Sequence, residues 1–103
     1  MDERWHLYLL RCGDGSLYCG IAKDVAARLS QHSAGKGARY TRGRGPLDLI
    51  AKAVCRTHRL ALQSELSFKR LSREQKLTVA RSSRALAAFV QRVSRASISP
   101  TKS

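Results

Sequence analysis

The feature that most constrains the fold is a pair of apolar segments joined by the turn sequence "CGDGS". Residues 5–12 and 17–22 are rich in aromatic and aliphatic side chains, which is typical of β-strands. The Asp14-Gly15 pair between them supplies the residues that tight hairpin turns prefer. We therefore expect the chain to begin with an antiparallel β-hairpin.

The register of this hairpin decides how Tyr8 and Tyr18 are placed. A three-residue loop over 13–15 pairs Leu10 with Tyr18 and makes the two tyrosines diagonal neighbours on one face. A two-residue loop puts them on opposite faces. The residues themselves leave both registers open, so the tyrosines are either ordinary strand aromatics or members of a shared site.

Helix signals dominate the rest of the chain. Asp24 is a good N-cap, Thr57 can cap a second helix, and Ser72 with Gln75 forms a capping box for a third. The expected elements are helices over 25–33, over 58–71 and from Ser72 onward, a strand over 47–55, and a last helix with Leu86, Phe89, Val90 and Val93 at helical spacing.

The chain length limits the number of domains. With 103 residues, the protein can form one compact domain but not two. We expect the main domain over residues 1–80 and a helical extension over 81–93. The Ser-rich segment 94–103 is expected to be a disordered tail.

The charge of the chain is strongly one-sided. Twenty lysines and arginines against seven acids give a formal net charge of +13. No acid lies between Asp24 and Asp48, and none follows Glu74. Such a charge favours a polyanionic partner, with nucleic acid ahead of an anionic membrane surface. No apolar run approaches the length of a membrane span.

The cysteines argue against a zinc-binding or disulfide-linked protein. Cys12, Cys19 and Cys55 are odd in number and lack CxxC spacing, so a zinc site or a disulfide framework is not expected. Free thiols in a reducing compartment are the simpler interpretation, and the N-terminus carries no secretory signal. We therefore expect a cytoplasmic protein, with the nucleoid as one location.

One acid occupies an unusual place in the predicted helix over 58–71. At about 100° per residue, Glu65 falls inside the apolar arc that Ala61, Leu62 and Leu66 define, and Lys69 falls there too. A buried carboxylate has to be paired, protonated or bound to a metal. The pattern leaves open a structural Glu65–Lys69 pair and a magnesium ligand for phosphodiester chemistry.

The chain contains four characteristic stretches, in the order "LYLLRC", "LYCG", "AARLSQH" and "SELSFKRL". Together they resemble the GIY-YIG nuclease superfamily. The likeness is to its small stand-alone bacterial group, called YhbQ-like or UPF0213, and it covers residues 5–79. The resemblance implies an α+β fold, with a small three-stranded, mainly antiparallel sheet flanked by helices. It also implies the register that places both tyrosines at one site.

The resemblance assigns roles residue by residue. Tyr8 and Tyr18 match the two tyrosines of the family, although the Gly-Ile before the first is absent here. Arg28 matches the arginine of the following helix, and His32 matches the His or Tyr one turn later. Glu65 matches the metal-binding glutamate.

The loop "GKGARYTRG" resembles a loop common in the stand-alone group, which implies that part of it belongs to the site. We expect basic residues of the 36–44 loop, and those after residue 69, to contact phosphates without reading sequence. The nucleic-acid-binding residues expected are Lys36, Arg39, Tyr40, Thr41, Arg42, Arg44 and Lys69.

The implied activity is magnesium-dependent, or manganese-dependent, hydrolysis of phosphodiester bonds in DNA, directed by structure rather than by sequence. Glu65 would hold the ion and Arg28 would stabilise charge on the phosphate. Tyr8 or Tyr18 would activate water with support from His32, and the positive surroundings would lower the tyrosine pKa. His32 is the alternative base, since its intrinsic pKa suits that role better.

A second function stays open. The chain contains no asparagine, whereas many nucleases of the family use a late one. A non-catalytic basic module that binds DNA or RNA on the same fold is therefore the alternative. Nucleic acid, DNA above all, is the expected partner in both cases, and neither a membrane nor an obligate protein partner is expected.

Overall fold

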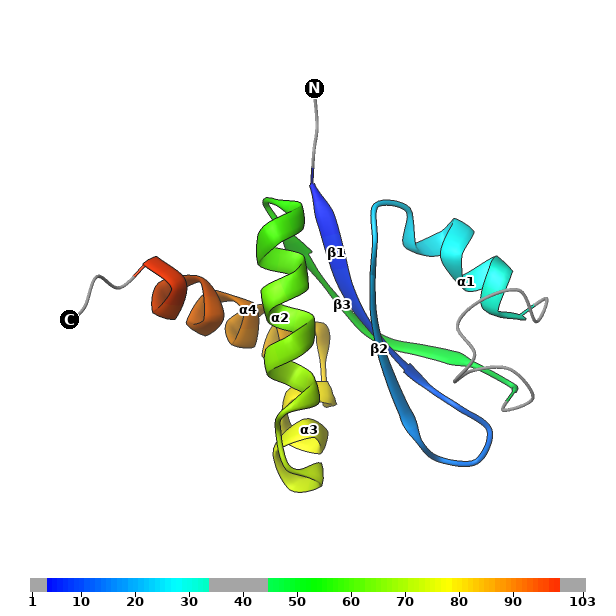
Figure 1. The fold of residues 1–103 in the computed structure, drawn as a ribbon. Helices are drawn as coiled ribbons and strands as arrows, with labels where there is room; N and C mark the ends of the chain where they lie inside the picture. Colours follow the sequence, from blue (N-terminus) through cyan, green and yellow to red (C-terminus); the bar gives the residue numbers. More distant parts are fainter. Residues whose placement is uncertain (1–3, 34–44, 99–103) are drawn as a thin grey trace.

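The computed structural model describes residues 4–33 and 45–98 of the chain. The elements are β1 (Trp5–Arg11), β2 (Leu17–Ala22), α1 (Val25–Ser33), β3 (Asp48–Cys55), α2 (His58–Lys69), α3 (Arg73–Ala80) and α4 (Ser83–Ile98). The strands form one antiparallel sheet in the order β2-β1-β3, with helices around it (Figure 1). The α+β prediction is confirmed.

The hairpin between β1 and β2 has the three-residue loop. Leu10 pairs with Tyr18, and the Cys12 amide donates to the carbonyl oxygen of Ser16 at 2.8 Å. Gly15 has a φ of 85°, a left-handed conformation that glycine adopts at no steric cost. Tyr8 and Tyr18 therefore lie on the same face of the sheet.

The sheet separates two packing layers (Figure 1). Leu7 and Leu9 of β1 are fully buried in the main core, to which α2, α3 and α4 contribute. Side chains alternate along a strand, so Tyr8 and Leu10 point the other way, where they pack with Val25 of α1. The tyrosine face is thus the face that α1 covers.

The last helix is longer than the sequence pattern predicts. We expected helix over 81–93 and a disordered tail over 94–103, but α4 continues to Ile98. Its apolar positions belong to the main core, and α4 packs against β3 and α2. Beyond Val93, Ala96 still faces Leu66 of α2 across a shared hollow. Apolar spacing marks only the part of a helix that packs on the core, and Arg95 and Ala96 extend α4 as exposed residues.

The three cysteines are all buried, and none forms a disulfide. This agrees with the free thiols expected from their number and spacing. Within residues 4–33 and 45–98, no helix combines the length and the apolar character needed to cross a membrane.

The capping box predicted at Ser72 is present and offers a test of the fold. The Gln75 amide donates to Ser72 Oγ at 3.1 Å, and the Ser72 amide donates to Gln75 Oε1 at 2.9 Å. We expect Ser72→Ala to lower the free energy of unfolding by about 1 kcal/mol, the usual loss for an N-cap. Urea denaturation measures it. Ser30→Ala, at an exposed position within α1, is the control. If Ser72→Ala and wild type have the same free energy of unfolding, the prediction is contradicted.

Candidate active site

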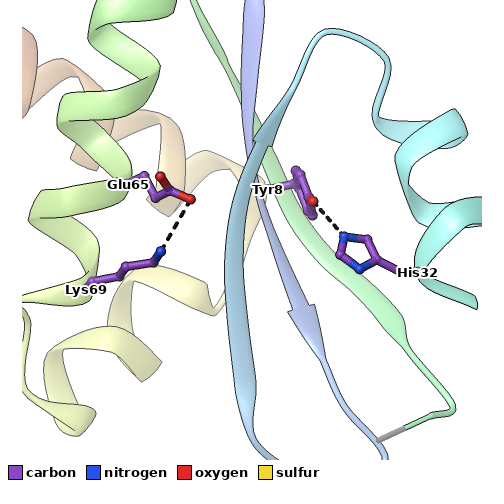
Figure 2. A network of polar contacts seen from close by, with 4 residues as sticks. All are labelled: Tyr8, His32, Glu65 and Lys69. Atoms are coloured by element: carbon purple, nitrogen blue, oxygen red, sulfur yellow. Dashed lines mark hydrogen bonds and ion pairs between the residues drawn. The ribbon is translucent and has the colours of Figure 1, made fainter. Parts of the chain in front are cut away.

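A buried hydrogen bond joins the sheet to α1. The Tyr8 hydroxyl lies 2.9 Å from His32 Nε2, and the two side chains are 1% and 2% exposed. Figure 2 shows the phenol of β1 directed at the imidazole of α1. Because buried polar atoms are costly without partners, this contact holds both side chains in place.

Tyr18 and Gly20 complete this arrangement from β2. The rings of Tyr8 and Tyr18 lie 6.3 Å apart, and the His32 ring lies 5.3 Å from that of Tyr18. A Cβ atom on Gly20 would stand 2.6 Å from the Tyr8 hydroxyl and 2.9 Å from Tyr18 Cε2. Only glycine therefore leaves room for both phenols, which explains the "YCG" motif physically.

Arg28 adds a cation to the same group, one helical turn before His32. Its guanidinium donates to Gln31 Oε1 at 2.8 Å and also hydrogen-bonds the Tyr8 hydroxyl. We call Tyr8, Tyr18, Arg28 and His32 the tyrosine cluster. All four were predicted from the sequence, and the fold brings them together.

Burial sets the protonation states of the tyrosine cluster. Desolvation, with a smaller effect from Tyr18, raises the pKa of Tyr8 to about 12. Desolvation followed by the charge of Glu65 raises the pKa of Tyr18. Desolvation followed by the charge of Arg28 lowers the pKa of His32. The expectation that cations lower the tyrosine pKa is therefore wrong for this structure, because burial outweighs Arg28.

Glu65 lies on the other side of β2 from Tyr8 and His32 (Figure 2). Its Oε2 forms an ion pair with Lys69 Nζ at 3.5 Å, and the side chains of Glu65 and Lys69 are 22% and 55% exposed. The carboxylate still acts on Tyr18, whose pKa it raises. Glu65 thus stands beside the tyrosine cluster rather than within it, with β2 between them.

The position of Glu65 differs from the helical-arc prediction. Leu62 and Leu66 are 46% and 53% exposed, and the buried residues of α2 are Ala61, Ser64 and Phe68. The core-facing stripe is therefore narrower than the apolar arc in the sequence. Glu65 lies at the border of that stripe, where its carboxylate reaches solvent.

Glu65 is the residue available for a divalent cation. Within residues 4–33 and 45–98 there is no group of three His, Cys, Asp or Glu side chains that could hold a metal. Magnesium is commonly held by one or two carboxylates together with substrate phosphates and water. A single, partly exposed carboxylate fits that mode of binding.

Most residues expected to bind nucleic acid fall outside the described residues. These are Lys36, Arg39, Tyr40, Thr41, Arg42 and Arg44. Lys69 is described, and it lines a hollow of about 320 Å³ beside β2. We call this the edge hollow, and its lining residues are Leu17, Tyr18, Cys19, Phe68, Lys69 and Lys76.

Lys76 belongs to the basic residues after residue 69 that were expected to bind phosphates, but the sequence did not single it out. It lies on α3, distant in sequence from Tyr18, and is one of 20 basic residues in the chain. No local motif distinguishes it from the other lysines and arginines. Only the placement of α3 beside β2 reveals it.

Comparison with known proteins identifies the family. The GIY-YIG catalytic domain family matches residues 4–78, which include all five predicted catalytic residues. The chain therefore belongs to the GIY-YIG family, a nuclease superfamily. The match spans β1 through most of α3 and ends before α4.

Relatives place the chain more narrowly, in the UPF0213 group. A UPF0213 protein of Cupriavidus pinatubonensis is 48% identical over 77 residues, which are 75% of this chain and 86% of the relative. One of Yersinia pestis is 51% identical over 75 residues, 73% of this chain and 79% of the relative. The solution NMR structure of an E. faecalis protein, 28% identical, covers 100% of this chain and 98% of its own with a TM-score of 0.52.

The space at Gly20 can be tested by filling it. Gly20→Ala forces at least one tyrosine to move, and we expect the free energy of unfolding to fall by about 1–3 kcal/mol, as for other overpacked sites. Urea denaturation measures the loss, and near-UV circular dichroism reports the displaced tyrosines. Gly45→Ala is the matched control, since its added Cβ would meet no atom within 4 Å. An unchanged tyrosine signal in Gly20→Ala would contradict the packing described.

The pKa of His32 gives a test of the cluster's electrostatics. NMR titration of the His32 ring should give a pKa below the ordinary 6.5. A histidine that is harder to protonate when folded stabilises the protein above pH 6.5, and this contribution is lost as the pH falls through the folded pKa. Arg28→Gln should raise the pKa of His32, because it removes a nearby cation.

Arg92→Gln, on α4, is the control for that titration and should leave the pKa of His32 unchanged. Equal values in wild type and Arg28→Gln would show that Arg28 does not act on His32.

Proposed function

We propose that this protein is a magnesium-dependent endonuclease that hydrolyses phosphodiester bonds in DNA. The observation that carries the proposal is the buried Tyr8–His32 hydrogen bond, with Arg28 and Tyr18 around it and Glu65 across β2. Membership of the GIY-YIG family and the net charge of +13 support the same conclusion. No other cluster of the described residues joins a neutral imidazole, two phenols and a guanidinium.

His32 is the proton acceptor in this proposal. A phenol with a pKa of about 12, like that of Tyr8, is a poor base at neutral pH. Tyr8 acts as a relay, so no stable phenolate forms. Its hydroxyl oxygen takes a proton from water while the proton of the hydroxyl passes to Nε2 of neutral His32. The 2.9 Å contact provides this path. Tyr18, the more exposed phenol, would meet the substrate.

Charge on the phosphate would be balanced by Arg28 and by the ion. Arg28 places a permanent cation beside the hydroxyl of Tyr8. Glu65 would hold a Mg²⁺ or Mn²⁺ ion, which supplies Lewis-acid polarisation of a phosphate oxygen. The Glu65–Lys69 pair is exposed enough on the lysine side to open when the ion binds.

We propose that the substrate is selected by structure rather than by base sequence. Lysines and arginines contact phosphates, which carry no sequence information. Branched, nicked and single-stranded DNA are therefore the substrates to test first, in the cytoplasm or at the nucleoid where DNA is found.

Glu65→Gln tests this function. Incubated with those DNA substrates and Mg²⁺, wild type should cut, and Glu65→Gln and Tyr18→Phe should lose at least 100-fold in rate, as expected for loss of an essential catalytic group. Glu74→Gln, an exposed acid on α3, is the matched control and should cut normally. Cutting that survives in Glu65→Gln would contradict the assignment.

A non-catalytic nucleic-acid-binding module is the second candidate. It is favoured by the absence of asparagine and by the Glu65–Lys69 ion pair, which gives Glu65 a structural partner. It predicts salt-dependent binding to DNA or RNA without cleavage under any metal. Glu65→Gln would then change stability more than binding.

A further inference from the structure

The edge hollow lies next to Tyr18 but takes no part in the proton transfer described above. Leu17, Tyr18 and Cys19 come from β2, Phe68 and Lys69 from α2, and Lys76 from α3. Its volume of about 320 Å³ is enough for one sugar and its phosphate, and too small for a folded partner. Tyr18 therefore connects the proposed site of cutting with a separate space beside it.

The two lysines of the edge hollow differ in their partners. Lys69 is held by Glu65 at 3.5 Å. Lys76 is only partly exposed, and among residues 4–33 and 45–98 it has no carboxylate within ion-pair distance. No carboxylate of these residues therefore competes with an anion for Lys76. An anion bound in the edge hollow would pair with its ammonium.

The walls of the edge hollow suit a sugar–phosphate. Lys76 Nζ lies over the Phe68 ring, 6.0 Å from its centre, which places the ammonium at this wall of the edge hollow. Leu17 and Phe68 contribute apolar walls, and Lys69 and Lys76 contribute ammonium groups. A strand leaving Tyr18 would lay its sugar against the apolar walls and its phosphate at the lysines.

We propose that the edge hollow binds the sugar–phosphate next to the bond at Tyr18, with Lys76 as the phosphate-binding residue. This inference rests on the proposed nuclease function and names a subsite for its substrate. The nucleic-acid strand then crosses the edge of the sheet at β2 and continues along α3. Because a phosphate is recognised, the subsite accepts any base.

Binding without cleavage tests this subsite. Fluorescence anisotropy with labelled nicked duplex DNA and labelled single-stranded DNA, in EDTA, measures affinity at several salt concentrations. Lys76→Met keeps the apolar stem and removes the charge. We expect weaker binding, with a salt slope smaller by about 0.9 for duplex and about 0.7 for single strands, as for the loss of one phosphate contact. Lys76→Arg should restore both.

Arg92→Met is the matched control. Arg92 also lies over a buried phenylalanine, 5.9 Å from the Phe89 ring, but on α4. The Arg92→Met substitution also removes one positive charge, and we expect it to change the salt slope much less than Lys76→Met does. A second measurement is the NMR shift of the Tyr18 and Cys19 amides when a thymidine dinucleotide is added, which should occur in wild type and be lost in Lys76→Met.

The outcomes separate the subsite from the function. If wild type binds DNA but Lys76→Met and Arg92→Met have equal salt slopes, Lys76 acts only through net charge and the subsite is overturned. If wild type binds no nucleic acid, both proposals fail. If Lys76→Met shows the expected change in salt slope but neither wild type nor any variant cuts DNA, the subsite belongs to a non-catalytic binding module and the nuclease proposal is wrong.

Discussion

The pairing of Leu10 with Tyr18 is the constraint on which the site depends. In this register Tyr8 and Tyr18 share the face covered by α1, and Gly20 leaves space for both rings. A shift of one residue would turn Tyr18 toward the main core and away from His32. The three-residue turn, with Gly15 in a left-handed conformation, is therefore as important to the site as the side chains.

The tyrosine cluster couples the stability of the fold to its proposed chemistry. The Tyr8–His32 pair is almost fully buried, next to apolar residues such as Leu10 and Val25. This environment favours neutral groups, so burial raises the pKa of both phenols and lowers that of the imidazole. The hydrogen bond that ties α1 to the sheet is thus also the proton path of the proposed function.

The edge strand β2 divides the polar groups into two sets. Among the described residues β2 pairs only with β1, so its other edge is left for α2 and α3 to flank. Tyr8 and His32 lie on one side of β2, and Glu65 and Lys69 lie on the other (Figure 2), while Tyr18 lines the edge hollow together with Lys69 and Lys76. Lysines near an unpaired edge also discourage pairing with another chain. The strand β2 therefore lies between the Tyr8–His32 hydrogen bond and the Glu65–Lys69 ion pair.

Local signals determined the elements of this protein. The Asp14-Gly15 turn and the caps at Asp24, Thr57 and Ser72 act between residues within a few positions, so the sequence predicted the elements to within two residues, except at the end of α4. The family resemblance added the tyrosine cluster and Glu65. Only the tertiary structure decided the direction of the pKa shifts, the place of Glu65 across β2 and the position of Lys76 beside Tyr18, because desolvation and long-range proximity exist only after the helices have packed on the sheet.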